Sequence, residues 1–181
     1  MPLQHLWATW RSDYVTSAVE TRSSDSEAVA AGTPARTLFE RILAADGSDD
    51  DKHIVARGEH CFVLLNKFPY TSGHLLVLPN RGEANLEDLS EAEHTELWQL
   101  VTTSVRAIKA AFQCDGVNVG VNLGAAAGGS QSDHLHVHCV PRWIGDANFI
   151  GVVAETRVLP VSLDQAHRQL RAVWVASPPA V

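Results

Sequence analysis

The sequence predicts an α+β domain in which an antiparallel sheet carries one long helix. Three observations lead to this prediction. Short apolar runs with strand character at 53–58, 60–66 and 74–80 are separated by turns. A single long segment with helical apolar periodicity follows them, and two further strand candidates at 117–122 and 134–140 come after it. Strands gathered around one long helix favour α+β architecture over repeating βαβ units.

Bulk composition limits the classes of protein that the chain can represent. A length of 181 residues with 45% hydrophobic residues fits one globular domain over 1–181. The net charge of -7, without a dense Lys and Arg cluster, argues against a general nucleic-acid coat, so an anionic ligand needs a local site. No apolar run is long enough for a membrane span, and the N-terminus does not resemble a signal peptide, which predicts a cytoplasmic protein.

The elements before the sheet differ in character. Trp7, Trp10 and Tyr14 supply too much aromatic surface for a free tail, so we expect that segment to dock on the body. Residues 17–36 are rich in Ser, Ala, acidic residues and Gly, which predicts a flexible insert. The stretch "TLFERILAAD" has apolar residues at helical spacing and predicts a short helix that stops near Gly47.

The long helix has the clearest start signal in the chain. Ser90 and Glu93 have capping-box spacing, the apolar face runs to Phe112, and Gly116 is the predicted stop. A C-terminal helix is predicted at 163–176 after a similar Ser-x-x-Gln cap. Three cysteines without a C-x-x-C pair predict neither a disulfide framework nor a structural zinc knuckle.

Histidine occupies alternate positions of the last strand candidate, at His134, His136 and His138. On a strand these three share one face, while the apolar residues between them pack on the other. The backbones of the outer two then lie ~13 Å apart, too far to close easily on one ion that takes nitrogens at ~2.1 Å. The pattern therefore disfavours a metal site, and a pair of these histidines would need a third ligand from elsewhere.

The loop before the histidines favours catalysis on phosphate. Residues 122–133 include three glycines and Ser130, and bare main-chain N–H groups in such a loop can hold phosphate oxygens: Gly124, Gly128 and Gly129. Neutral imidazole attacks phosphorus and is a good leaving group from the resulting phosphoramidate. The middle histidine, His136, is best placed to attack, because its neighbours can orient it.

The segment "HLHVHCV" matches His-φ-His-φ-His-φ-φ, the signature of the histidine triad (HIT) superfamily of nucleotidyl hydrolases and transferases, except at Cys139. The surrounding "GVNVGVNLGAAAGGSQSDHLHVHCVPRW" resembles the branch of bacterial diadenosine tetraphosphate (Ap4A) phosphorylases and related hydrolases. So do "NKFPYTSGHLLVLPNR", "LWATWRSDYV" and "GDANFIGVVAETRVLP". The resemblance covers nearly the whole chain outside 17–36.

The resemblance implies a HIT-like fold, an antiparallel sheet of about five strands that continues across a homodimer. It also implies cleavage of dinucleoside polyphosphates at the α-phosphorus through a nucleotidyl-histidine. Ser130 and Trp143 favour phosphorolysis over hydrolysis. A nucleoside phosphoramidase and a non-catalytic nucleotide-binding protein stay as alternatives. The expected partners are the nucleotide and inorganic phosphate, with neither nucleic acid nor membrane.

Residue roles follow from the same resemblance. His136 corresponds to the nucleophile, His134 and His138 to its supports, and His74 completes the histidine cluster. The positions expected to contact nucleotide or phosphate are Asn66, Asn122, Gly129, Ser130 and Trp143. Two of these residues also have a purely structural interpretation. Asn66 suits a turn, and Trp143 suits a core or dimer contact.

The resemblance implies that no cofactor is needed for the covalent chemistry, while a divalent ion accompanying the polyphosphate stays open. Many relatives carry a C-x-F-C zinc motif where this chain has "TLFE". Thr37 and Glu40 occupy the two cysteine positions, which predicts that the family zinc site is lost.

Overall fold

The computed structural model describes residues 36–128, 131–147 and 159–176, and from Thr37 onward these belong to one compact unit. The predicted N-terminal docking segment and the insert at 17–36 lie outside the described residues. So do two positions of the glycine-rich loop, Gly129 and Ser130. The single domain over 1–181 therefore stays a prediction.

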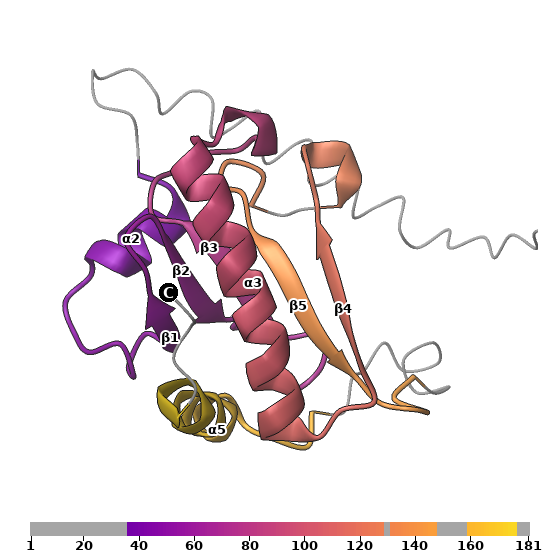
Figure 1. The fold of residues 1–181 in the computed structure, drawn as a ribbon. Coiled ribbons are helices and arrows are strands. Elements are labelled where there is room, and N and C mark those ends of the chain that lie inside the picture. The colour runs from indigo at the N-terminus through magenta and orange to yellow at the C-terminus, as the bar shows by residue number, and fades with distance from the viewer. Residues whose placement is uncertain (1–35, 129–130, 148–158, 177–181) are drawn as a thin grey trace, which may run out of the picture. The chain divides into compact units, whose positions relative to one another are not determined.

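Five antiparallel strands form one sheet, as the sequence predicts (Figure 1). Their order in the sheet is β1-β2-β3-β5-β4. Because β5 lies between β3 and β4, residues distant in sequence meet on its surface. The strand bounds are β1 Ile54–Arg57, β2 Cys61–Leu65, β3 Leu75–Pro79, β4 Gly116–Val121 and β5 Val137–Arg142.

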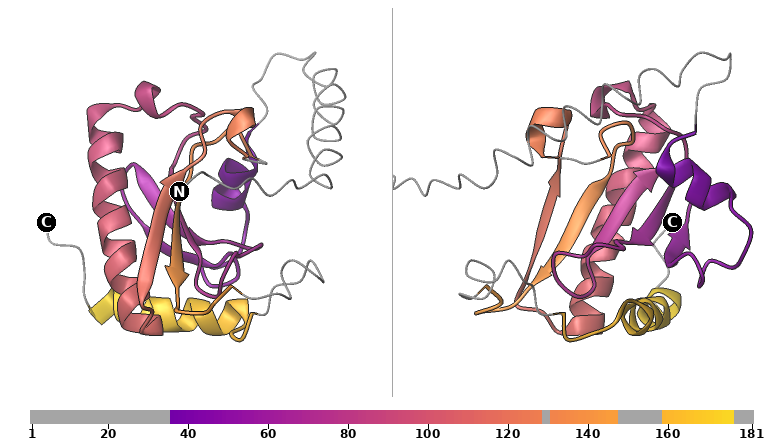
Figure 2. Two further views of the ribbon diagram at one scale, coloured as in Figure 1. Left: turned by 90° about the vertical axis from the view of Figure 1, so that its right-hand side faces the viewer. Right: turned by 180° about the vertical axis from the view of Figure 1, so that it is seen from behind.

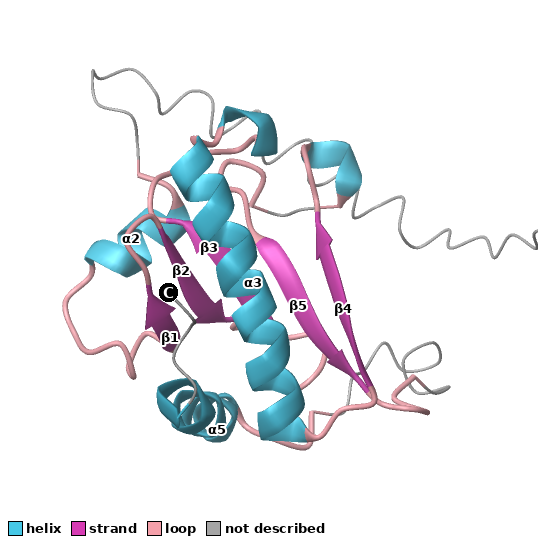
Figure 3. Cartoon of the chain, in the orientation of Figure 1, coloured by secondary structure: helices cyan, strands magenta, loops and turns pink. Residues whose placement is uncertain are grey.

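Helices cover both faces of this sheet (Figures 2 and 3). The long helix α3, Glu91–Phe112, runs along one face, and the short helix α2, Leu38–Ala44, lies on the other. The C-terminal helix α5, Leu163–Ala176, packs against α3 and β1. No helix in the described ranges is both long and apolar enough to cross a membrane.

Burial on both faces explains why β2 and β3 have no polar alternation. Every residue of these two strands is buried. Val63 and Leu75 face the core under α3, whereas Phe62 and Leu76 face the smaller core under α2. Covered strands read as continuous apolar runs because neither face meets water. The same alternation holds beyond β3, since Leu135, Val137 and Cys139 all join the α3 core.

Capping boxes begin the first two α-helices of the described chain, α2 and α3. The predicted pair of Ser90 and Glu93 is formed at α3. The predicted stop at Gly116 is wrong, because α3 ends at Phe112 and Gln113 adopts the left-handed conformation with φ 48°. Gly116 instead begins β4. The left-handed position at the end of a helix is most often glycine or asparagine. Gln113 therefore gave no sequence signal that the helix ends there.

The predicted strand at 134–140 is corrected at its start. The ladder between β3 and β5 begins where Val77 pairs with Val137, and it does not include His134 to His136. Extending it would place Leu135 opposite Pro79, which has no N–H to donate. The amide of Leu135 donates to the main-chain oxygen of Glu83 instead. The first two histidines therefore lie just outside the regular sheet.

The turn before β3 depends on Gly73. Its φ is +85°, and a Cβ at this position would overlap the ring of Phe112 at the end of α3. We predict that Gly73→Ala lowers the free energy of unfolding by about 2 kcal/mol, because backbone strain and overpacking add. Urea denaturation measures the change. Gly116→Ala is the control, since a Cβ there meets nothing within 4 Å. Equal effects of the two substitutions would contradict the prediction.

Candidate active site

The sheet brings three of the four predicted histidines together. His138 lies on β5 and pairs with Leu76 of β3, so it stands beside His74 at the start of that strand. Nε2 of His74 and Nδ1 of His138 are 2.9 Å apart. The rings of His136 and His138 have centroids 4.9 Å apart. Imidazoles from two chain segments thus form one cluster on the α2 side of the sheet.

His136 has a defined proton position. Its Nδ1 lies 2.7 Å from the main-chain oxygen of His134. Because a carbonyl oxygen only accepts, Nδ1 must carry the proton, and in the neutral ring Nε2 keeps its lone pair. No described residue forms a hydrogen bond with this Nε2. The atom is therefore available to a reacting group.

The proton position of His74 follows from its neighbours in the preceding turn. Its Nδ1 accepts from the main-chain N–H of Tyr70 at 3.1 Å and from Nδ2 of Asn66 at 3.2 Å. The amide orientation of Asn66 is fixed, because its Oδ1 accepts from the N–H of Phe68 at 3.0 Å. With Nδ1 accepting, the proton of neutral His74 is on Nε2 and is donated to His138.

His138 is consequently a proton donor toward the site. Burial, and secondly the neighbouring His136, lowers the pKa of His138 to about 4, so the ring is neutral near pH 7. Since Nδ1 accepts from His74, its own proton is on Nε2. That nitrogen is buried and has no hydrogen-bond partner within the described ranges. A buried donor without a partner is costly, and an anionic oxygen beside His136 would satisfy it.

His134 faces the protein rather than the site. Its ring is 1% exposed, its Nε2 donates to the main-chain oxygen of Pro79 at 2.9 Å, and its Nδ1 lies 2.7 Å from Oγ1 of Thr37. Burial is the main cause that lowers its pKa. Phe39 of α2 packs against both rings, with centroids 5.3 Å from His134 and 5.6 Å from His136. His134 thus contributes its main-chain oxygen, which holds the ring of His136.

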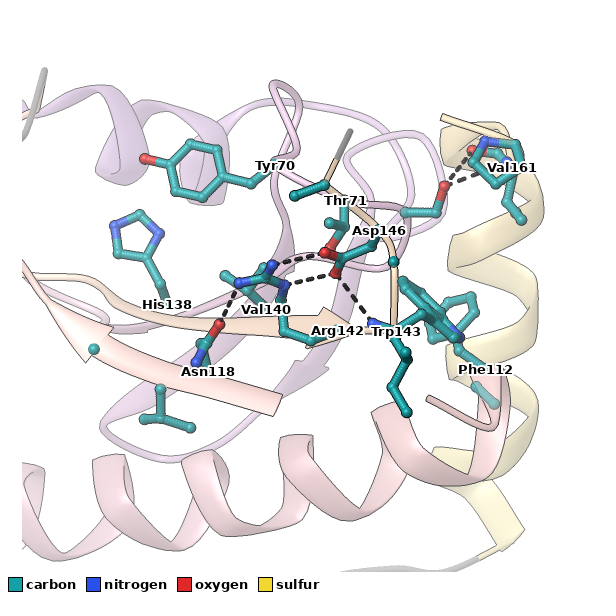
Figure 4. A pocket seen from close by; sticks show the side chains of 18 of the residues that line it. Tyr70, Thr71, Phe112, Asn118, His138, Val140, Arg142, Trp143, Asp146 and Val161 are labelled. Atoms are coloured by element: carbon teal, nitrogen blue, oxygen red, sulfur yellow. Dashed lines mark hydrogen bonds and ion pairs between the residues drawn. The ribbon is translucent and has the colours of Figure 1, made fainter. Parts of the chain in front are cut away.

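A pocket of about 1240 Å³ opens beside the cluster and is lined by His138 together with two further predicted residues, Asn122 and Trp143 (Figure 4). Asn66, by contrast, uses both polar groups of its side chain within the protein, one of them in the turn contact to Phe68. The structure thus supports the ordinary reading of Asn66 as a turn residue and adds a contact to His74. The roles of all these residues with nucleotide stay predictions.

Sequence reasoning missed Tyr70. Its ring stacks on His138 with an interplanar angle of 16° and a centroid distance of 5.7 Å, and it lines the pocket. The two residues meet only because the turn before β3 lies next to β5 in the sheet. An aromatic residue four positions before His74 in a Pro and Gly turn was the available signal.

A second missed feature orders the turn after β5. Nε and Nη2 of Arg142 donate to the carboxylate of Asp146 at 2.6 and 2.7 Å, while Nη1 donates to Oδ1 of Asn118 at 2.8 Å (Figure 4). The hydrogen bonds from Arg142 hold the pKa of Asp146 at about 2. Asp146 also accepts from the N–H of Trp143 at 3.1 Å. This ion pair therefore fixes the turn on which Trp143 stands.

The remaining candidates for nucleophile or metal ligand fit poorly. Burial raises the pKa of Cys61 and of Cys139 to about 12, so both thiols stay protonated. At the two positions where the sequence predicts the loss of the zinc cysteines, the hydroxyl of Thr37 bonds the Nδ1 of His134, and the carboxylate of Glu40 accepts the N–H of Thr37 at 2.8 Å. Zinc takes thiolate, imidazole nitrogen or free carboxylate, so this donor set does not suit it.

These features define a histidine triad protein: a five-stranded antiparallel sheet with alternate histidines at the start of an inner strand. Residues 48–143 match the family model described as HIT domain, and the chain belongs to this family. The predicted family and HIT-like fold are thereby confirmed.

An AP-4-A phosphorylase of Mycobacterium tuberculosis is 41% identical over 176 residues, which cover 97% of this chain and 87% of the relative. The asymmetrical bis(5'-nucleosyl)-tetraphosphatase of Schizosaccharomyces pombe is 36% identical over 78 residues, 43% of this chain and 42% of that protein. A Zn-bound histidine triad family protein from Mycobacterium smegmatis has a similar structure, with a TM-score of 0.63, 26% identity, and coverage of 77% and 94%. The prediction of a HIT-family enzyme is confirmed, since the named activities among these relatives are enzymatic.

The low pKa of His138 makes stability depend on pH. The pKa is about 4 in the folded protein and near 6.5 in the unfolded chain, so the unfolded chain binds more protons between these values. The contribution is complete above pH 6.5 and is lost as the pH falls toward 4. We predict that His138→Gln reduces the stability loss between pH 7 and pH 4 by roughly 2 kcal/mol. Urea denaturation at both pH values measures it.

His94→Gln on the exposed side of α3 is the matched control for this experiment. It removes a histidine while leaving the cluster intact. A stability loss that is the same in wild type, His138→Gln and the control would contradict the assignment of His138 as a buried neutral group.

Proposed function

We propose that this protein cleaves dinucleoside polyphosphates of the Ap4A type at the α-phosphorus, through a nucleotidyl intermediate on His136. The observation that supports this most directly is the pairing of two nitrogens. The ring of His136, whose Nε2 keeps its lone pair, lies 4.9 Å by centroid from the ring of His138, whose buried Nε2–H has no partner among the described residues. The names of the Mycobacterium tuberculosis and Schizosaccharomyces pombe relatives support the substrate class.

In the first step, Nε2 of His136 attacks the α-phosphorus and forms a P–N bond. The bond from that phosphorus to the bridging oxygen breaks, and the leaving nucleotide keeps the electron pair. The Nδ1–H of His136 remains bonded to the oxygen of His134, which stabilises the positive charge that develops on the ring. The Nε2–H of His138 donates to an oxygen of the transferred group, where negative charge is concentrated.

In the second step, an oxygen of phosphate or water attacks the same phosphorus, and the P–N bond breaks with its electron pair returning to His136. From Ap4A, phosphate yields ADP and ATP, whereas water yields AMP and ATP. We favour phosphate, because the relative that matches 97% of this chain is an AP-4-A phosphorylase. The pocket beside His138 has room for an acceptor, and the predicted contact residues Asn122 and Trp143 line it.

The homodimer implied by the family resemblance belongs to this proposal as well. β4 is at one end of the strand order, and Val119 in its middle is 42% exposed. Pairing of two β4 strands would continue the sheet from one protomer to its partner. The cytoplasmic location predicted from the sequence stays a prediction.

Incubation with Ap4A, in the presence and absence of inorganic phosphate, tests the reaction. We expect ADP to appear only with phosphate, and His136→Ala to lower turnover at least about a thousand-fold, because the nucleophile is lost. His94→Ala serves as the control histidine outside the cluster. Separation of the nucleotides by anion-exchange chromatography measures the products.

Each other outcome of this experiment points to a different reaction. AMP in both incubations would exclude phosphorolysis and identify a hydrolase. Release of amine from a nucleoside phosphoramidate without turnover of Ap4A would identify a phosphoramidase. Unchanged turnover in His136→Ala would overturn the nucleophile, and nucleotide binding without any turnover would identify a non-catalytic member of the family.

Asn66 provides a test of the proton positions in the cluster. Asn66→Asp replaces a donor to His74 Nδ1 by a carboxylate, which favours a proton on that nitrogen and reverses the donation to His138. We expect kcat to fall about a hundred-fold, as for a wrong histidine tautomer. Asn80→Asp, an exposed amide bonded to Glu59, is the control. Wild-type kcat in Asn66→Asp would contradict the tautomer assignment.

A further inference from the structure

The nucleophile of the proposed reaction is not held by the sheet ladder. Regular pairing with β3 starts at Val137, so the segment of His134 to His136 needs other contacts to fix its conformation. Three hydrogen bonds join this segment to other parts of the described chain. The N–H of Leu135 donates to the oxygen of Glu83, His134 Nε2 donates to Pro79, and Thr37 contacts His134. The last of these comes from a separate element, the N-terminus of α2.

The direction of the contact to Thr37 follows from the other hydrogen bonds. Nε2 of His134 carries its proton, because it faces the carbonyl oxygen of Pro79 at 2.9 Å. Nδ1 of the neutral ring is therefore an acceptor, and the hydroxyl of Thr37 must donate to it at 2.7 Å. The same hydroxyl oxygen accepts from the N–H of Glu40 at 3.3 Å, as an N-cap does.

We propose that Thr37 is a positioning residue for catalysis. Its hydroxyl holds the ring of His134, the main-chain oxygen of His134 holds Nδ1 of His136, and the Nε2 of His136 is thereby aimed at the substrate. The inference rests on the proposed function, because it assumes that His136 is the nucleophile. Among the described residues, the hydroxyl of Thr37 forms hydrogen bonds with His134 and Glu40 and none with His136, so its effect on His136 runs through His134.

Helix capping alone does not account for this hydrogen bond. A cap needs only the acceptor function of the hydroxyl, and Ser90 provides that function in the same way at α3. Thr37 uses its proton as well, toward a histidine 97 positions later in the chain. Glu40 supports the arrangement by accepting the N–H of Thr37 at 2.8 Å, which fixes the main chain on which the hydroxyl stands.

This arrangement also gives a physical account of the departure from the family's cysteine motif. Thr37 and Glu40 stand at the two cysteine positions, and their side chains hold His134 and the helix start without a metal. The group that contacts the ring of His134 is the hydroxyl proton of Thr37 rather than a metal cation. If a zinc ion were bound at this nitrogen, it would need the Nδ1 lone pair that the hydroxyl proton of Thr37 occupies.

Two substitutions of Thr37 separate the donor from the side-chain shape. Thr37→Val keeps the shape and removes the hydroxyl, whereas Thr37→Ser keeps the hydroxyl. We expect Thr37→Val to lower kcat with Ap4A about ten-fold with KM within two-fold, the effect of one hydrogen bond, and Thr37→Ser to stay within about three-fold of wild type. The rate at which the nucleotidyl-enzyme forms in a single turnover should fall in parallel with kcat.

Ser90→Ala is the matched control for the loss of a capping hydroxyl, since it removes the same kind of cap from α3 away from the histidines. Melting temperatures of all variants show how far each loss is structural. Wild-type kcat in folded Thr37→Val, or equal losses in the Val and Ser variants, would overturn the inference. His136→Ala, run in parallel, distinguishes this failure from failure of the proposed function, which would appear as unchanged turnover in that variant.

A measurement on the wild-type protein keeps the inference testable if Thr37→Val does not fold. Long-range ¹H–¹⁵N spectra of histidine-labelled protein distinguish the two imidazole tautomers. We expect His134 with its proton on Nε2 and His136 with its proton on Nδ1. A proton on Nδ1 of His134 would exclude donation from Thr37 and would overturn the inference.

Discussion

The hydrogen bond from the imidazole of His136 to the main-chain oxygen of His134 is the contact on which the organisation of the site depends. It decides which ring nitrogen is free and points that nitrogen away from its own backbone. Because the acceptor is a carbonyl oxygen, the donor cannot reverse its role. The hydrogen bonds of His134 to Pro79 and Thr37 hold the residue that supplies this carbonyl, and the one between His74 and His138 orients a second group beside the free nitrogen.

The hydrogen bonds of the neighbouring pair, His74 and His138, also have a fixed direction. The main-chain N–H of Tyr70 and the side-chain Nδ2 of Asn66 can only donate to His74, and this direction passes through two rings to a buried N–H at the edge of the pocket. Burial keeps His138 neutral, which preserves its single proton for donation. His136 and His138 thus take opposite roles although they are the same residue type. His136 offers an electron pair, and His138 offers a proton.

Local sequence patterns predicted much of this molecule. Periodicity located all five strands, Ser90 and Glu93 marked the start of α3, and the alternation around His136 separated the polar from the apolar face. The break in the ladder before Val137 was not predictable, because it depends on the register that would place Leu135 opposite Pro79 and on the carbonyl of Glu83 in a distant turn. The contact between Tyr70 and His138 likewise requires the register between two strands, which no local pattern encodes.

Burial of β2 and β3 on both faces also constrains how proteins of this architecture can diverge. These strands have no solvent side on which a substitution is neutral, so almost any change in them alters a packed core. β4 is different, since its residues are partly or fully exposed and its face borders the pocket. Substitutions can therefore accumulate along β4, which borders the pocket, while β2 and β3 stay constrained by the two cores. The wall of the pocket that β4 forms can thus change without altering the strands that are covered on both faces.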